Sequence, residues 1–435
     1  MNARLRNSIA LGSALAMGLG VSTGHPLGIV AAAAMPFACL APGTRKDAFK
    51  SGLAYYIGGL WPIVPGLGRY IGQSVTILIP LAIWVVAAIM LSVPWTLAAT
   101  SDRFQCLWRA PLALVATVIP PLGIIGVASP LTAAGYLFPG TAWAGLAVVG
   151  LMPGIFLSTQ RMAFRRRCVV TRLAISLCMG LAIGGRLFGS ASAEPPGGWV
   201  AINTNFGDVS QPFRDFVAAQ FIQQKVTESS ARVLVFPEAV VPRWSGATEA
   251  FWRETLDRCR NRGQILAIGA GLPVQARNSM GTPQKLSDLK LYDFGAAIAA
   301  LKRMDTTFPH EAQSKPGPEP IDNTMVVLGA ESATFFQRVP VPVGMWRPFS
   351  RASVPLRLSA PGVLTIDHQQ VAVLICYEQM LTFPILASML RHPTVIVGIS
   401  NTFWVDGTTI PRYQATALRG WASLFGLPYF LAVNS

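Results

Sequence analysis

The feature that most constrains this chain is a series of long apolar runs in its first half. A helix needs about 20 apolar residues to cross the hydrocarbon core of a membrane, and runs of that order recur between residues 7 and 188. They predict about seven transmembrane helices, near residues 7–23, 26–42, 51–66, 71–98, 110–128, 139–158 and 171–188. The apolar stretch 128–140, with Pro130 and Pro139, could form an eighth short or re-entrant element.

Basic residues between these runs orient the predicted helices. Residues 1–196 carry 14 Lys or Arg but only 3 Asp or Glu, and so hold most of the net charge of +15. Seven crossings place all the basic clusters on one side, which the positive-inside rule assigns to the cytoplasm. The clusters are Arg4 with Arg6, Arg45 with Lys46 and Lys50, Arg103 with Arg109, and the arginines of 161–167.

This orientation predicts a multi-pass protein of the bacterial inner membrane, whose C-terminal part lies in the periplasm. With an eighth complete crossing, the C-terminal part would instead lie in the cytoplasm. The basic residues do not form a face with interleaved aromatic residues, so direct nucleic-acid binding is not expected. The predicted helices also lack a set of charged residues at membrane depth, which makes a transporter a weak hypothesis.

The chain changes character near residue 190. We expect a membrane domain over residues 1–188, a linker of small, Pro- and Gly-rich composition over 189–197, and a second domain over 198–435. In the second domain, short apolar β-branched runs alternate with amphipathic helical patterns, which favours an α/β layered fold. Residues 274–320 have little periodicity and are expected to form an insertion or long surface loops.

Three segments of the second domain carry residues suited to chemistry. VFPEAV places Glu238 at the end of an apolar strand, and VAVLICYEQM places Cys376 directly after another strand, with Glu378 two residues later. Between them lies FFQRVPVPVGMW, residues 335–346. A cysteine thiol becomes a nucleophile only when a base or a lowered pKa supplies the thiolate. A buried glutamate is a suitable base.

These motifs, in this order, resemble the nitrilase superfamily of carbon–nitrogen hydrolases. The multi-span anchor makes the chain most similar to the apolipoprotein N-acyltransferase branch of that superfamily. The resemblance implies an α-β-β-α sandwich over residues 198–435, joined to a multi-span α-helical membrane domain. The membrane-plus-nitrilase layout and the VPVGMW segment also resemble a family of plasmid conjugal transfer proteins. That similarity implies partners in a conjugation or cell-envelope assembly.

The resemblance implies specific roles. Cys376 would be the nucleophile, Glu238 the general base, and the backbone N–H of Tyr377 a donor to the oxyanion. The implied substrate is an amide or acyl compound, either lipid-linked or a protein. No cofactor is implied, and the six cysteines show no CxxC or Cys/His spacing that would suggest a metal.

Two positions depart from the superfamily pattern. The position of the family lysine, five residues before the Pro of VPxG, is Gln337, and its neighbour Arg338 points to the opposite face of a strand. The glutamate that follows VPxG in the acyltransferase branch is replaced by Met345. We expect Gln337 or Arg338 to support the oxyanion or the pocket, and Met345 to line the pocket.

Several interpretations stay open. Glu378 could support the pocket or form a structural ion pair, and Arg338 could be structural or face the substrate. Tyr377 and Trp404 could pack in the core or line the pocket mouth. For the whole chain, a membrane-anchored thiol hydrolase or acyltransferase competes with a non-catalytic scaffold, because Gln337 and Met345 lack the expected charges.

Overall fold

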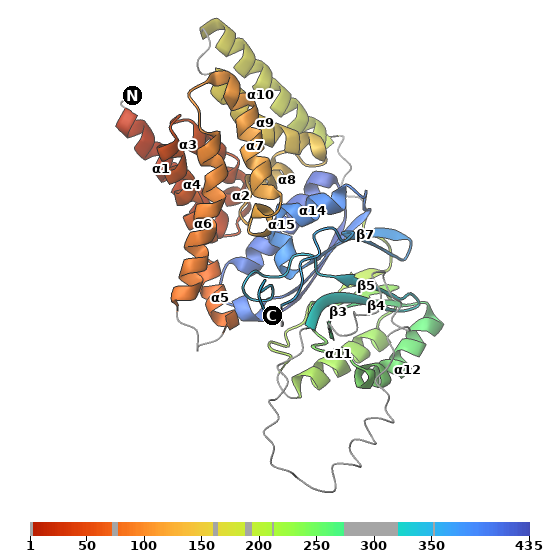
Figure 1. The fold of residues 1–435 in the computed structure, drawn as a ribbon. Coiled ribbons are helices and arrows are strands. Elements are labelled where there is room, and N and C mark those ends of the chain that lie inside the picture. Colours follow the sequence, from red (N-terminus) through yellow and green to blue (C-terminus); the bar gives the residue numbers. More distant parts are fainter. Residues whose placement is uncertain are drawn as a thin grey trace, which may run out of the picture.

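The computed structural model describes residues 3–71, 77–159, 164–187, 194–210, 213–273, 321–350 and 353–435. A helical region formed by the first half of the chain packs against a two-sheet sandwich formed by the second half (Figure 1). The insertion expected over 274–320 and most of the expected linker lie outside the described residues.

The helices of the first half follow the apolar runs, with breaks. Their bounds are α1 Ala3–Ser22, α2 Pro26–Ala32, α3 Met35–Leu40, α4 Arg45–Leu60, α5 Ile63–Ile71, α6 Leu78–Ala98, α7 Arg103–Val118, α8 Ala134–Leu137, α9 Trp143–Thr159 and α10 Phe164–Leu187. The run 26–42 forms two helices, with Pro36 in the first turn of the second, where a proline is tolerated. The run 51–66 is divided between α4 and α5, and Pro62 lies at that junction.

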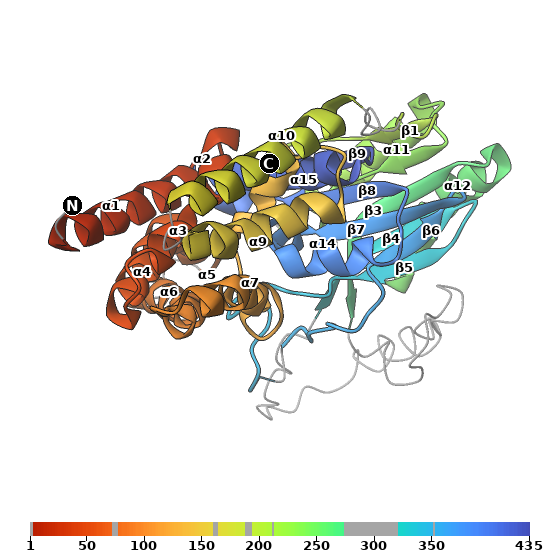
Figure 2. The same ribbon diagram turned by 90° about the horizontal axis from the view of Figure 1, so that it is seen from above.

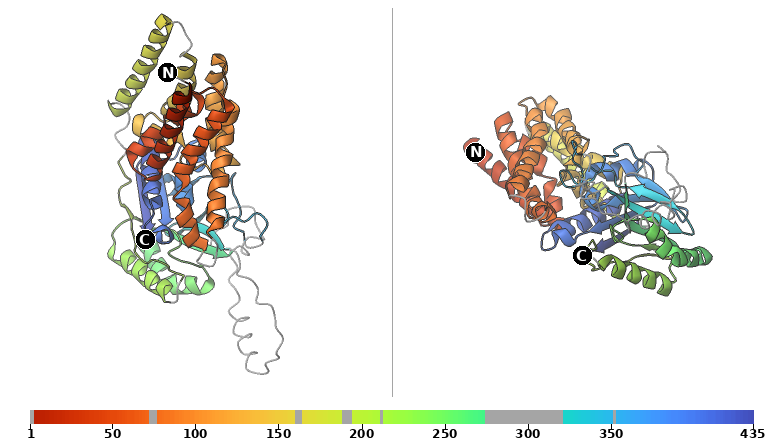
Figure 3. Two further views of the ribbon diagram at one scale, coloured as in Figure 1. Left: turned by 90° about the vertical axis from the view of Figure 1, so that its left-hand side faces the viewer. Right: turned by 60° about the horizontal axis from the view of Figure 1, so that its bottom comes forward.

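Two described helices are long and apolar enough to cross a membrane. These segments are Leu78–Ala98, with a mean hydropathy of 2.2, and Cys168–Arg186, with a mean hydropathy of 1.8. The second contributes almost nothing to the protein interior and stands along the outside of the helical region (Figure 3). The stretch 128–140 forms only the short 3-10 turn η2, Pro130–Ala133, and the single-turn α8, so it does not make a complete crossing.

The first sheet of the sandwich has five strands in sequence order. They are β1 Trp199–Ala201, β2 Val233–Val235, β3 Ile265–Pro273, β4 Ile321–Gly329 and β5 Ala333–Phe336. The pairs β1–β2 and β2–β3 are parallel, while β3–β4 and β4–β5 are antiparallel. The continuous apolar runs of β2 and β3 are buried throughout, as strands covered on both faces require.

The second sheet has four strands, also in sequence order. They are β6 Val363–Ile366, β7 Gln369–Ile375, β8 Val395–Asn401 and β9 Tyr429–Asn434. Strands β7, β8 and β9 are parallel, so their carboxyl ends meet at one edge of the sheet. Facing side chains of the two sheets, such as Val235, Val373 and Val397, form the core between them.

Helices cover the outer faces of both sheets. On the first sheet lie α11, Arg214–Glu228, and α12, Gly246–Arg262, whose buried residues share a core with β2 and β3. On the second lie α14, Thr382–Met389, and α15, Ile410–Phe425. This arrangement is the α-β-β-α sandwich that the sequence resemblance implied.

The helical region packs on the α14–α15 layer, which Figure 2 shows between the N-terminal helices and the sheets. Their buried residues form one continuous core. Hydrogen bonds cross the contact from the Tyr136 hydroxyl to Thr416 O, at 2.7 Å, and from the Thr416 hydroxyl to Gly24 O, at 2.8 Å. Because α15 also faces the sandwich, it joins the two halves of the protein.

Candidate active site

Glu238 is held in place by a close approach of two backbones. It follows β2 after Phe236 and Pro237, and the next residue, Ala239, has a left-handed φ of 55°. A Cβ atom at Gly269 of β3 would lie 2.3 Å from Pro237 O and 2.4 Å from Glu238 Cα. Only glycine allows this approach, so Gly269 fixes the backbone position from which the Glu238 side chain extends.

Cys376 lies directly after β7, at the start of the 3-10 turn η5, Cys376–Met380. Its φ of 50° is unusual for a residue that carries a Cβ atom, and such conformations persist only where the surroundings enforce them. One constraint is Glu378, whose carboxylate accepts from Ile375 N at 3.1 Å, Arg338 N at 2.6 Å and Val339 N at 3.0 Å. Glu378 therefore ties the cysteine turn to the segment after β5.

Cys376 and Glu238 line the same cavity, and each influences the pKa of the other. The Glu238 carboxylate accepts from the Asn323 side chain and, at 2.7 Å, from Asn401 N. Both asparagines come from strand ends, Asn323 from β4 and Asn401 from β8. The sequence analysis did not identify either of them.

Gln337 is buried next to Asn323. Its Oε1 accepts from Asn323 Nδ2 at 3.1 Å, and its Nε2 donates to Ile375 O at 3.1 Å. Both ends of the amide are thus engaged with protein atoms. Gln337 does not line the cavity described below, and it supports the site through Asn323.

Burial controls the charge states of Cys376 and Glu238. Desolvation raises the pKa of Glu238 to about 7, although hydrogen bonds from Cys376, Asn323 and Asn401 oppose the rise. Desolvation also raises the pKa of the Cys376 thiol well above its usual range, and the negative charge of Glu238 raises it further. A glutamate that titrates near neutral pH next to a neutral thiol is suited to accept the thiol proton during attack.

A third residue that the sequence analysis missed contacts the cysteine from α15. Gln414 is buried, and its Nε2 donates to Cys376 O at 3.1 Å and lies 3.9 Å from Cys376 Sγ. Its polarity on the buried face of an amphipathic helix is the signal that could have identified it.

Cys376 and Glu238 open into a cavity of about 660 Å³. Asn323, Asn401, Met345 and Trp404 also line it. So do Arg69 and Tyr70, which come from α5 in the helical region. The helical region therefore forms part of the cavity wall.

Besides Gln337, three predicted support residues have side chains that do not line the cavity. The Arg338 guanidinium points away from the cavity and donates to Pro384 O, Ser388 Oγ and Val373 O at 3.0–3.3 Å. Of the two roles that the sequence left open for Arg338, these contacts fit the structural one and not the substrate-facing one. Glu378 pairs with Arg338 Nε at 3.5 Å and is a structural ion-pair partner. The Tyr377 hydroxyl donates to Ile124 O at 2.9 Å, toward the helical region. Met345 and Trp404 do line the cavity.

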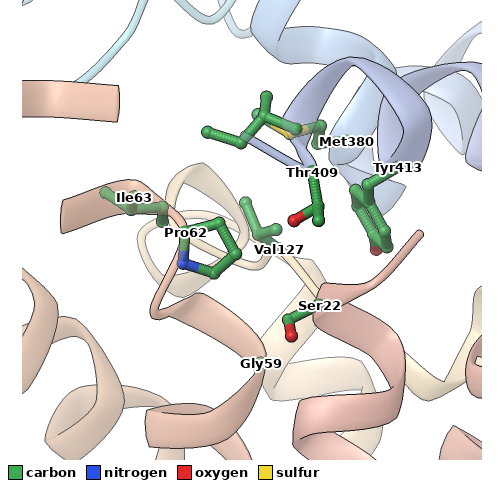
Figure 4. Close-up of a pocket in the computed structure, with 9 residues that line it drawn as sticks. Ser22, Gly59, Pro62, Ile63, Val127, Met380, Thr409 and Tyr413 are labelled. Atoms are coloured by element: carbon green, nitrogen blue, oxygen red, sulfur yellow. The ribbon is translucent and has the colours of Figure 1, made fainter. Parts of the chain in front are cut away.

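A much smaller cavity lies between the helical region and α15 (Figure 4). Its volume of about 20 Å³ is enclosed mainly by apolar side chains, among them Pro62, Val127 and Met380. This space holds at most about one water molecule. It is a packing defect of the contact and not a substrate site.

Among the described residues, no group of three or more His, Cys, Asp or Glu side chains could hold a metal ion. The two sheets and their outer helices form an α-β-β-α sandwich in the second half of the chain, and Cys376 and Glu238 line one cavity in it.

The chain has curated homologues named for conjugal transfer. It is 28% identical over 349 residues to conjugal transfer protein TraB of Agrobacterium fabrum, covering 75% of this chain and 68% of that protein. It is 26% identical over 436 residues to probable conjugal transfer protein TraB of Sinorhizobium fredii, covering 95% and 94% of the two chains. No family model matches the chain.

Among solved structures, about half of the chain is similar to an amidase from Nesterenkonia sp.. One variant of that amidase, with acrylamide added at its active-site cysteine, is 16% identical, with a TM-score of 0.30 over 54% of this chain and 77% of the amidase. Another crystal structure of the amidase is 14% identical, with a TM-score of 0.29 over 54% and 74% of the two chains.

Proposed function

We propose that the protein is a membrane-anchored thiol hydrolase or acyltransferase of the nitrilase type that acts in plasmid conjugal transfer. The observation that carries the proposal is that Cys376 and Glu238 lie together in the wall of a cavity of about 660 Å³ and influence each other's pKa. The elevated pKa values of both groups and the left-handed cysteine backbone support it. Such perturbed groups in a cavity are typical of catalytic sites.

The proposed reaction begins when Glu238 accepts the proton of the Cys376 thiol. The sulfur attacks the carbonyl carbon of an amide or acyl substrate, and the carbonyl oxygen becomes an oxyanion beside the backbone N–H of Tyr377. The bond from carbon to the leaving nitrogen or oxygen then breaks, and Glu238 returns its proton to the leaving group. Water or an amine attacks the resulting thioester, releases the acyl group and restores the thiol.

The helical region, in this proposal, crosses the inner membrane about seven times, and the sandwich lies in the periplasm. In the expected orientation the connection near residues 66–71 lies on the periplasmic side, and its residues Arg69 and Tyr70 line the cavity. The hydrogen bond from Arg69 to Asp406 O joins this connection to the sandwich. A cavity at the membrane surface favours a lipid-linked substrate or a protein of the cell envelope.

The orientation is tested with a maleimide that cannot cross the inner membrane, applied to spheroplasts. Glu254, whose side chain is 88% exposed on α12, and Lys46, which is exposed at the start of α4, are replaced by cysteine separately. A periplasmic sandwich requires labelling of Glu254→Cys and protection of Lys46→Cys until the cells are lysed. The reverse pattern would place the sandwich in the cytoplasm.

A second candidate function is a non-catalytic scaffold of a conjugation or cell-envelope assembly. One observation favours it: Gln337 occupies the lysine position and uses both ends of its amide on Asn323 and Ile375. No positive charge is supplied there to stabilise an oxyanion.

Transfer of a plasmid from a donor that lacks the gene separates the two functions. Complementation with Cys376→Ala is expected to leave transfer at the level of the empty donor, whereas Cys259→Ala, which alters a buried cysteine of α12, restores it. Immunoblots of membranes show that both variants accumulate. Full transfer with Cys376→Ala would support the scaffold and reject the enzyme.

A further inference from the structure

The candidate site lacks the side-chain donor that the resemblance led us to expect for the oxyanion. Gln337 is committed to Asn323 and Ile375, and Arg338 is committed to Pro384, Ser388 and Val373. A backbone N–H alone would leave the developing charge with weak stabilisation in a buried site. A donor from another element would compensate for this loss.

Tyr70 of α5 lines the same cavity. Its ring packs edge-on against Trp404, with the ring centroids 5.2 Å apart. On another side it packs against Gly344, where an added Cβ atom would lie 2.8 Å from Tyr70 Cε1. The ring is therefore held in place by two cavity segments, while 38% of the residue remains exposed. In the described part of the chain, the hydroxyl has no hydrogen-bond partner that would occupy it.

The hydroxyl also responds to the catalytic pair. Burial of part of the side chain raises the pKa of Tyr70 to about 12, and the charges that Glu238 and Cys376 carry when deprotonated add to the rise. The group thus stays protonated at any physiological pH, and it is near enough to the pair to sense both charges. A neutral O–H group is a good hydrogen-bond donor to an oxyanion.

Arg69, the neighbouring residue, is a weaker candidate. Its guanidinium donates to Asp406 O and lies near Gly407, at the rim of the cavity. That contact holds α5 against the loop after η6, Phe403–Val405, and so fixes the position of Tyr70.

We propose that the Tyr70 hydroxyl, supplied by the helical region, is the oxyanion donor that replaces the missing lysine. The proposal rests on the proposed thiol chemistry. When the Cys376 sulfur bonds to the carbonyl carbon and the thiol proton passes to Glu238, Tyr70 donates a hydrogen bond to the carbonyl oxygen and keeps its own proton. It follows that the sandwich is complete as a catalyst only when α5 is docked on it.

Two reactions at Cys376 test this role on the full-length protein in detergent. Acylation by p-nitrophenyl acetate forms an oxyanion, whereas alkylation by iodoacetamide displaces iodide and forms none. Mass spectrometry measures the rate of each reaction at Cys376. Tyr70→Phe removes only the hydroxyl and keeps the ring packing, and Gly344→Ala shifts the ring instead. Tyr136→Phe is the matched control, since its hydroxyl bonds Thr416 O outside the cavity.

We expect Tyr70→Phe and Gly344→Ala to slow acylation by roughly 10²-fold, the effect of losing one oxyanion donor, and to leave alkylation unchanged. Tyr136→Phe should change neither rate. Unchanged acylation in Tyr70→Phe would overturn the role of Tyr70 and leave the proposed function standing. Equal slowing of both reactions would also overturn it, because Tyr70 would then act on access or folding. A wild-type Cys376 that is not acylated at all would reject the proposed function, and the role of Tyr70 with it.

Discussion

Gln414 holds Cys376 from the helix that joins the two halves of the protein. Its Nε2 donates to Cys376 O at 3.1 Å and lies 3.9 Å from the sulfur. The Nε2 atom of Gln414, and not its Oε1 atom, faces Cys376 O, because the opposite orientation of the amide would place two acceptor oxygens next to each other. Gln414 thus fixes a left-handed backbone that costs roughly 1–3 kcal/mol, and it places a donor beside the developing thiolate.

Gln414→Leu is expected to reduce the rate of Cys376 alkylation by about tenfold at neutral pH, the equivalent of one buried hydrogen bond. The control is Gln379→Leu, since Gln379 is also buried and donates to Leu374 O and Ile399 O without contacting the sulfur. The control should lose stability but keep the alkylation rate. Equal rates in wild type and Gln414→Leu would contradict the role of Gln414.

Gly269→Ala should disable the proposed site without changing the Cys376 and Glu238 side chains. The added methyl group would collide with Pro237 O and Glu238 Cα, so the base must move. A displacement of about 1 Å can cost 10²-fold in rate, and we expect acylation of Cys376 to fall by about that factor. Gly197→Ala, where an added Cβ atom meets nothing within 4 Å, should behave as wild type. Normal acylation in Gly269→Ala would show that this close approach does not position the base.

Glu238 should make the protein less stable as pH rises. Its pKa is about 7 in the folded protein and 4.5 as the ordinary value, so the unfolded chain loses this proton first. The free energy of unfolding therefore falls as the pH rises from about 4.5 to about 7. The fall is about 3 kcal/mol, at 1.36 kcal/mol per unit of pKa difference, and the free energy stays constant at higher pH. Thermal unfolding in detergent at pH 5 and pH 8 should show this fall in wild type but not in Glu238→Gln. The same pH dependence in both proteins would contradict the raised pKa.

The buried pair of Arg338 and Glu378 is expected to be structural. Both side chains are almost fully inaccessible, and removal of one partner leaves a buried charge uncompensated. Arg338→Met should therefore destabilise the protein by about 3–5 kcal/mol. Arg260→Ala breaks a pair with Asp257 that is more than half exposed, and should cost less than about 1 kcal/mol. A small effect of Arg338→Met on the thermal midpoint would contradict this assignment.

The order of motifs was sufficient to predict the sandwich and to bring Glu238, Cys376, Met345 and Trp404 to one cavity. These residues follow strands whose ends meet in this fold, so local pattern determines their placement. The role of Arg338 stayed open because strand alternation predicts the face of its side chain but not the acceptors on α14 and β7 that hold its guanidinium.

Asn323, Gln414 and Tyr70 could not be placed from the sequence because contacts between distant elements position them. Asn323 sits in a buried strand end, IDNT, whose polarity was the available signal. Tyr70 lies between two apolar runs and reaches the site only through docking of α5 on η6. The sequence analysis also missed the breaks that divide two apolar runs into separate helices. These breaks lie near Pro36 and Pro62, and tertiary packing decides where the helices end.

The pH profile of Cys376 alkylation in wild type and Glu238→Gln tests the central claim most directly. Mass spectrometry would follow the iodoacetamide adduct on the native full-length protein from pH 5 to pH 9. The structure predicts a wild-type rate that rises through an inflection near pH 7, where Glu238 ionises, and a slower rate without that inflection in Glu238→Gln. Identical profiles in the two proteins, or labelling of Cys376 only after denaturation, would contradict a catalytic cysteine–glutamate pair.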